Sequence, residues 1–169
     1  MRRLRLAVLV AATMLTSACD DLVSIHALYT PEDRVADPSI EGTWQHHEDQ
    51  LVVERRGDAY RMTLQNKKDP KESAVYDVHL VDLGGVRFAD LLLDDSIGHM
   101  IVRARVTDGK LRFAFLDSKW LRDRVPHENV VGANRTRAVL TLRTPALRAL
   151  ATKYAHEPKA FDEETAFER

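Results

Sequence analysis

Cysteine occurs once in the 169 residues, so the chain cannot form an intramolecular disulfide or a cysteine-rich zinc cluster. Seven glycines and six prolines are too few for a collagen-like or linker-dominated chain. An excess of charge of one sign is also lacking: the formal net charge is −1, which gives no reason to expect nucleic-acid binding. The 44% hydrophobic and 30% charged residues that remain suit one globular domain with a real core.

Short catalytic and nucleotide-binding motifs are absent as well. The sequence has no nucleophile elbow (G-x-S-x-G), phosphate-binding loop (G-x-x-x-x-G-K), dinucleotide fingerprint (G-x-G-x-x-G) or zinc protease motif (H-E-x-x-H). We therefore expect a protein that is not an enzyme and carries no cofactor.

The strongest candidate for a metal site is the run of four potential ligands at 46–49 (HHED). In a strand, His46 and His47 point to opposite faces, so both cannot hold one ion. His79 and His99 lie on other predicted strands and would have to converge with one of them. We interpret these histidines as surface or strand-end residues and expect no metal site.

The first twenty residues have the pattern of an export signal. A cationic start (MRRLR) precedes ten uncharged apolar residues at 6–15. This run is too short for a membrane-spanning helix, which takes about 20 residues, but it suits the apolar region of a signal peptide. Thr16-Ser17-Ala18 then lead into the single cysteine, Cys19. This segment resembles the lipobox of bacterial lipoproteins, in which the cysteine becomes the new N-terminus and carries the lipid.

The resemblance implies a signal peptide over 1–18 and a lipid-anchored N-terminal segment over 19–40. A diacylglyceryl group on Cys19 would hold the body on a membrane, facing the periplasm, because two acyl chains anchor stably where one does not. Asp20 resembles the signal that retains enterobacterial lipoproteins in the inner membrane, and favours that membrane over the outer one. The alternative is an ordinary cleaved signal peptide that leaves Cys19 as a chance thiol.

Residues 19–40 contain several large apolar side chains, so we expect part of this segment to dock on the body. The stretch S-x-H-x-L-Y-T-P-E-D at 24–33, followed by Gly42-Thr43-Trp44, resembles a group of bacterial lipoproteins of unassigned function. That resemblance brings no activity with it.

From residue 41 onward the hydrophobic pattern alternates with a period of two, as in half-buried strands. Glycine-containing turns separate the alternating runs. Such strands in sequential hairpins suit an up-and-down barrel, which leaves no exposed edge; an open half-barrel or a two-sheet sandwich is the alternative. We predict eight strands, at 42–46, 51–55, 59–65, 74–83, 86–93, 99–106, 110–116 and 137–143.

Two helices complete the predicted mainly β fold. Asp117 is a suitable N-cap for a short inserted helix that Pro126 ends. Thr144 and Pro145 suit the start of a C-terminal helix with one apolar stripe. The pattern therefore predicts a β-barrel-like domain over 41–143 and a helical segment over 144–169.

Gly42-Thr43-Trp44 also resembles the G-x-W of the first strand of lipocalins. Arg143 falls at the end of the last predicted strand, just before the helix. In lipocalins an arginine at that place packs over the tryptophan. The resemblance thus implies a lipocalin-like barrel with a cation–π contact between Trp44 and Arg143.

Asp108-Gly109 predicts a two-residue hairpin turn. Its register sets Arg105 directly across from Arg112, with Arg103 on the same face. Because opposed like charges are destabilising, this face needs an anion. Either neighbouring carboxylates such as Asp90 or Asp94 neutralise it, or the three arginines face anionic headgroups or an acidic envelope polymer.

Three functions fit these features. The first is a barrel that binds a small apolar ligand or lipid beside the membrane, since eight strands enclose just enough room for one small ligand. The second is a non-catalytic interaction or structural lipoprotein that docks an envelope partner. The third is a metal-dependent hydrolase with a site built from His46 and another strand. The missing motifs favour the first two, and a continuous interior cavity would favour the first over the second.

Replacing Cys19 tests the anchor. Cys19→Ser removes the thiol that lipid attachment requires, so we expect the precursor to stay uncleaved or the protein to be released from the membrane. Membrane fractionation and the mass of the N-terminal peptide measure both. Normal processing and unchanged membrane association of the variant would contradict the lipoprotein interpretation.

Overall fold

The computed structural model describes residues 21–69, 71, 73–94, 98–134 and 137–169. Eight of its strands are β3 (Gly42–His46), β4 (Asp49–Arg56), β5 (Ala59–Asn66), β6 (Ser73–Leu83), β7 (Val86–Leu93), β8 (His99–Thr107), β9 (Lys110–Phe115) and β12 (Thr165–Glu168). Further strands are β1 (Asp21–Ser24), β2 (Arg34–Val35), β10 (Val130–Asn134) and β11 (Arg137–Leu140). The helices are α1 (Ser118–Arg122) and α2 (Thr144–Tyr154), with 3-10 turns η1 (Pro38–Ile40), η2 (His127–Asn129) and η3 (Pro158–Ala160).

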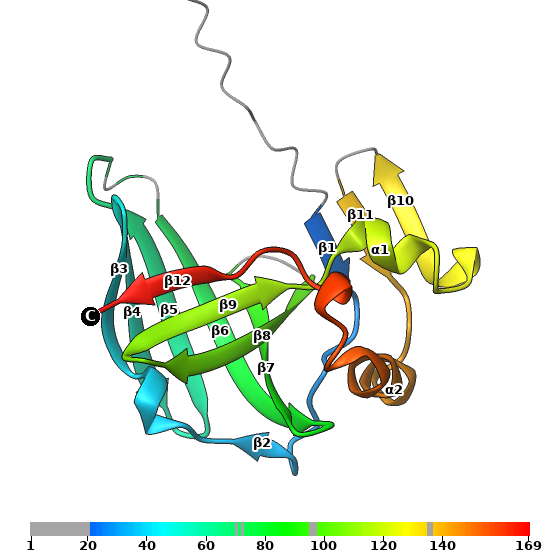
Figure 1. The fold of residues 1–169 in the computed structure, drawn as a ribbon, viewed down its shortest axis with the longest axis horizontal. Helices are drawn as coiled ribbons and strands as arrows, with labels where there is room; N and C mark the ends of the chain where they lie inside the picture. Colours follow the sequence, from blue (N-terminus) through cyan, green and yellow to red (C-terminus); the bar gives the residue numbers. More distant parts are fainter. Residues whose placement is uncertain (1–20, 70, 72, 95–97, 135–136) are drawn as a thin grey trace, which may run out of the picture.

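These strands form one sheet that closes on itself. From β8 the order runs through β7, β6, β5, β4, β3 and β12 to β9, and β9 pairs with β8 again. The result is a closed antiparallel barrel of eight strands with two helices beside it (Figure 1). The predicted mainly β, barrel-like fold with a short inserted helix and a C-terminal helix is confirmed.

The hairpin between β8 and β9 has the predicted register. Asp108 and Gly109 have φ of 54° and 71°, and positive φ at both central residues is what a type I′ turn requires. Arg105 lies opposite Arg112 in the ladder. Local turn chemistry therefore fixes this part of the barrel.

The eighth barrel strand differs from the prediction. Residues 137–140 do form a strand, β11, but it pairs in parallel with β1 and antiparallel with β10, outside the barrel. The barrel is closed instead by β12 near the C-terminus, which pairs with β9 and β3. The segment 144–169 is thus not only helical. A prediction that pairs each strand with the next one along the chain misses β12, because its partners β3 and β9 are far away in the sequence.

Side chains that point into the barrel fill its lower half. The 3-10 turn η1 covers this end, where Ile40 is buried and its carbonyl accepts a 2.8 Å hydrogen bond from Nε1 of Trp44. The hydroxyl of Tyr60 accepts a bond from the amide of Asp37 next to η1. Around them pack further buried side chains from the surrounding strands: Val53, Met62, Val78, Leu80, Val102 and Leu111.

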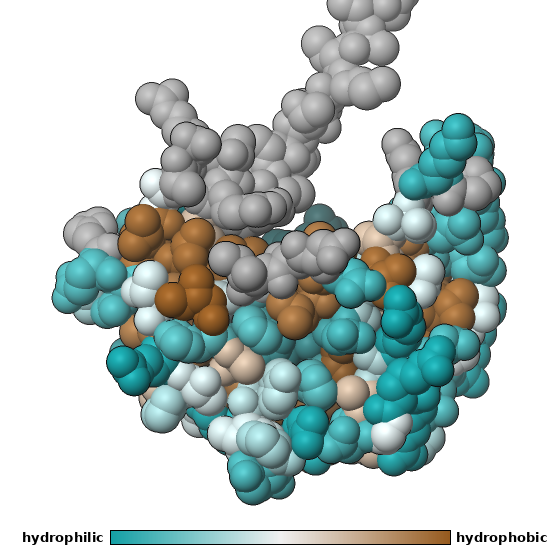
Figure 2. All heavy atoms as spheres, turned by 180° about the vertical axis from the view of Figure 1, so that it is seen from behind, coloured by the Kyte–Doolittle hydropathy of each residue, from teal (hydrophilic) through white to brown (hydrophobic). Residues whose placement is uncertain are grey.

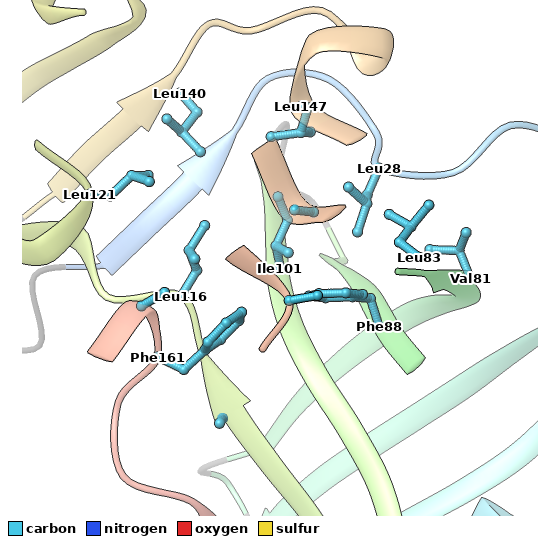
Figure 3. Packing of buried hydrophobic residues seen from close by; sticks show 14 of the residues in the cluster. Leu28, Val81, Leu83, Phe88, Ile101, Leu116, Leu121, Leu140, Leu147 and Phe161 are labelled. Carbon is cyan, nitrogen blue, oxygen red and sulfur yellow. The ribbon is translucent and has the colours of Figure 1, made fainter. Parts of the chain in front are cut away.

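A second core lies outside the barrel, between its wall and a covering layer. The outward faces of β6 to β8 carry apolar residues, as the nearly continuous run at 86–93 indicates. β1, α2 and η3 lie over them together with Leu28, which is fully buried. The described part of the N-terminal segment, from residue 21 onward, is thus docked on the barrel wall. Figure 3 shows this packing of Leu28, Val81, Leu83, Phe88, Ile101, Leu116, Leu121, Leu140, Leu147 and Phe161.

The two helices begin in different ways: α1 has a side-chain N-cap from its own sequence, whereas the start of α2 is held by a contact with a distant segment. Asp117 accepts a 2.7 Å hydrogen bond from the amide of Trp120 and caps α1 as predicted. The N-cap of α2 is Arg143, which makes no side-chain cap. The hydroxyl of Thr144 donates instead to the carbonyl of Ala27, and so ties α2 to the N-terminal segment.

The predicted contact between Trp44 and Arg143 is wrong. Arg143 lies at the start of α2, because the strand before it is not part of the barrel. The guanidinium carbon of Arg169 lies 4.6 Å from the centre of a Trp44 ring. Arg169 follows β12, the true last strand of the barrel, so an arginine in that place does cover the tryptophan.

A double-mutant cycle tests this assignment. Trp44→Ala should lower the free energy of unfolding by about 3 to 5 kcal/mol, because the indole is fully buried. Combined with Arg169→Ala it should show a coupling of about 0.5 to 1 kcal/mol. Arg143→Ala is the matched control and should be additive with Trp44→Ala in chemical denaturation. Equal coupling for both arginines would contradict the assignment.

Candidate binding site at the barrel mouth

The upper half of the barrel is hollow. A cavity of about 570 Å³ opens at the end opposite η1 and extends past the strand ends to residues outside the barrel, among them Leu22, Leu116 and Lys119. Its volume lies within the range of sites that hold one small molecule. Its wall consists mainly of inward-facing apolar side chains of the barrel strands: Leu51, Met62, Leu64, Tyr76, Leu91, Met100, Phe113 and Phe167.

The two ends of the barrel differ in how the chain closes them. At the lower end the connections are short turns at 57–58, 84–85 and 108–109, and η1 lies across the interior beneath Trp44. At the upper end, residues from the strand ends and from outside the barrel form a rim around the opening. Leu22 of β1 and Lys119 of α1 stand on this rim. Among the described residues, the barrel is therefore closed at the end with η1 and open at the other end, which we call the mouth.

Polar groups lie on the rim rather than inside the barrel. Nδ1 of His46 is 2.8 Å from the carbonyl oxygen of Ala166. Asp162 accepts a 2.7 Å hydrogen bond from the amide of Phe115, and burial is the main cause that raises the pKa of its carboxyl. Together with Asp117, which caps α1, these groups hold the rim in place. The polar end of an elongated ligand would meet them.

Large apolar side chains are also exposed around the mouth. Phe115 lines the cavity and is 40% exposed. Leu93, opposite Tyr76 in the ladder, is 36% exposed. Figure 2 shows a further group of hydrophobic residues on the side of the rear face where β1, β10 and β11 lie, while the lower part of that face is mainly hydrophilic. The mouth thus exposes apolar surface at Phe115 and Leu93, and Ile25 and Val131 expose more on the side that carries β1 and β10.

The three arginines of the β8–β9 hairpin do not lie at the mouth. On the outer wall, Arg105 is 2.8 Å and Arg112 is 3.9 Å from a carboxylate oxygen of Glu164. The guanidinium carbon of Arg103 lies 3.9 Å from the centre of the Phe161 ring. The anion that the opposed pair Arg105 and Arg112 needs is therefore supplied within the chain. It comes from Glu164, not from Asp90 or Asp94 as the sequence suggested.

In the sequence, Asp90 is predicted only as a partner for the arginines, but the structure buries it in the outer wall. Asp90, only 1% exposed, accepts a 2.6 Å hydrogen bond from the amide of Leu28. Its second oxygen lies 2.7 Å from Nδ1 of His99. Asp90 therefore pins the N-terminal segment to β7 and β8. The signal for it was available, since Asp90 stands between two apolar pairs, Phe88-Ala89 and Leu91-Leu92.

The histidines considered for a metal site are not brought together. His46 lies at the mouth, whereas His99 lies on the outer wall with Asp90, and the ring of His79 stacks on Tyr29 at 4.0 Å between ring centres. Within the ranges that the structure describes, no group of three His, Cys, Asp or Glu residues could hold a metal ion. The geometry therefore gives no support to a metal-dependent hydrolase.

Cys19 and Asp20 lie outside the described residues, so the structure does not bear on the predicted anchor. Across the part of the chain that is described, no helix is both long enough and apolar enough to cross a membrane.

Comparisons with models of protein families, with curated proteins and with solved structures found no match to this chain. Its class is therefore defined by its own geometry. It is a closed eight-stranded antiparallel barrel with one covered wall and an apolar cavity that is open at one end.

Acid should weaken the docking of the N-terminal segment through His79. Burial and, after it, the charge of Arg34 lower the pKa of His79 below its usual 6.5. As the pH falls through 6.5 the unfolded chain takes up a proton that the folded chain resists, so this stabilisation is present above 6.5 and is lost toward the folded pKa.

His79→Phe keeps a ring against Tyr29 but cannot titrate. Its free energy of unfolding should therefore fall less than that of the parent between pH 7.5 and pH 5, measured by chemical denaturation. Parallel losses in the two proteins would show that His79 contributes nothing to the acid sensitivity.

Proposed function

We propose that this protein is a binding module that holds one small apolar ligand, with the dimensions and chemistry of a lipid acyl chain, inside its barrel. The observation that carries the proposal is the cavity of about 570 Å³ above a filled lower core. A barrel that served only as a structural scaffold would gain stability by filling this space, because an internal void forfeits packing contacts.

The lining supports an apolar occupant. A buried water needs two to four polar partners, and the leucine, methionine and phenylalanine side chains of the wall offer none. The polar rim at His46, Asp49 and Lys119 would meet the more hydrophilic end of a bound molecule. This arrangement, an apolar body with a few polar groups at its mouth, is typical of ligand-binding clefts.

The cellular setting is part of the same proposal. We propose that lipid on Cys19 anchors the body to the inner membrane, with the barrel in the periplasm, on the strength of the apolar leader, the small residues before Cys19 and the following Asp20. No catalytic role is assigned to the barrel.

Filling the cavity tests the binding function. Leu64→Trp adds a large ring where Leu64 lines the cavity, and should weaken binding of N-phenyl-1-naphthylamine and of a twelve-carbon fatty acid that displaces it by more than about tenfold. Fluorescence titration measures both ligands. The matched control is Thr63→Trp, on the opposite face of the same strand, which should bind like the parent. Binding unaffected by Leu64→Trp, or no binding by the parent, would overturn the proposal.

A further inference from the structure

We infer that the mouth of the barrel faces the membrane to which the chain is anchored, and that an acyl chain from that bilayer passes directly into the cavity. This inference rests on the proposed function, and adds to it the source of the ligand and the orientation of the molecule.

The first observation is where the N-terminal strand joins the barrel. β1 is held in the sheet, in parallel with β11 and next to the start of β8 through Ser24 and His99. Leu22, in the middle of β1, lines the cavity. In Figure 1 the first residues of β1 lie at the same end as the open mouth. The chain therefore reaches the body at the rim of the cavity.

The second observation is the short reach of the anchor. Cys19 precedes Leu22 by three residues, and three extended residues span at most about 11 Å. The wall strand β4 has eight residues, which cover about 26 Å along the strand and, at the tilt of about 40° that barrel strands have, about 20 Å along the barrel axis. A lipid on Cys19 must then enter the bilayer close to the mouth. Whatever path residues 19–21 take, they are too short to let the opposite end of the barrel rest on the same membrane surface.

The third observation is the difference between the two ends. Phe115 and Leu93 expose apolar surface at the mouth, where it can contact the bilayer interface. At the opposite end, near η1, the strands are joined by turns that are flanked by exposed charged side chains such as Arg56. On the outer wall Arg105 and Arg112 share the carboxylate of Glu164, which reduces the positive charge that this wall presents to a membrane.

An acyl chain that enters from the bilayer exchanges one apolar environment for another. A chain that arrives through water must first expose every methylene group, at a free-energy cost that grows with its length. A cavity that opens onto the bilayer avoids that cost. The geometry therefore assigns the ligand to the chemistry of membrane acyl chains, supplied from the membrane itself.

Tryptophan quenching tests the orientation. The full-length lipidated protein is purified in detergent and reconstituted into phosphatidylcholine vesicles with brominated acyl chains. Phe115→Trp adds a fluorophore at the mouth, and Arg56→Trp, the matched control, adds one at the opposite end. Relative to the parent, bromine should quench the added signal at least twofold more for Phe115→Trp. Equal quenching, or stronger quenching for Arg56→Trp, would overturn the inference.

A spacer tests the direct transfer. A flexible linker of 20 Gly and Ser residues inserted between Asp20 and Asp21 has an average span of about 25 Å, enough to uncouple the mouth from the bilayer. The initial rate at which the barrel takes up a pyrene-labelled acyl chain from its own vesicle should fall at least fivefold, with the final occupancy unchanged.

The outcomes separate the two proposals. Equal rates with and without the linker overturn direct transfer and leave the binding function standing. No uptake by either protein, in vesicles or from solution, overturns the binding function. If the protein does not reconstitute and the mass of its N-terminal peptide shows no lipid on Cys19, the proposed anchor is wrong. This inference is then wrong as well.

Discussion

The apolar face that β7 and β8 turn away from the barrel interior is the constraint on which the rest of the structure depends. Phe88 and Ile101 point outward from a wall whose inner face is already apolar, so the wall must be buried on both sides. Burial of such side chains is a dominant stabilising contribution to folding. It requires a second layer, and β1, α2 and η3 provide it. The position of the N-terminal segment beside the mouth follows from this requirement.

Burial of the outer face of this wall also explains the polar links within the covering layer. A carboxylate in an apolar wall is costly unless every oxygen finds a partner. Asp90 meets this condition with the amide of Leu28 and the ring of His99. The hydroxyl of Thr144 binds the carbonyl of Ala27 nearby. These bonds fix the segment around Ala27 and Leu28, so β1 and the mouth keep one relative position.

The sequence predicts well what short-range interactions decide. The turn at Asp108-Gly109 sets the register of its hairpin, and alternation locates the strands from β3 to β9. It fails where the partner is distant. β12 is four residues long and pairs with strands about 50 and 120 residues earlier, so no period marks it. With β12 unseen, Arg169 and Glu164 could not be placed. The cavity was also beyond reach, because the same alternation describes a filled barrel and a hollow one.

Closure by β12 has a consequence for how the chain folds. The sheet grows hairpin by hairpin from β3 to β9, yet the edges of these two strands stay unpaired until residues 165–168 reach them. A chain made from its N-terminus therefore completes its barrel only after β12 has been synthesised, about 50 residues after β9. Until then it presents two open edges that could pair with other chains. The four-residue strand β12 therefore closes a barrel whose other seven strands are already paired.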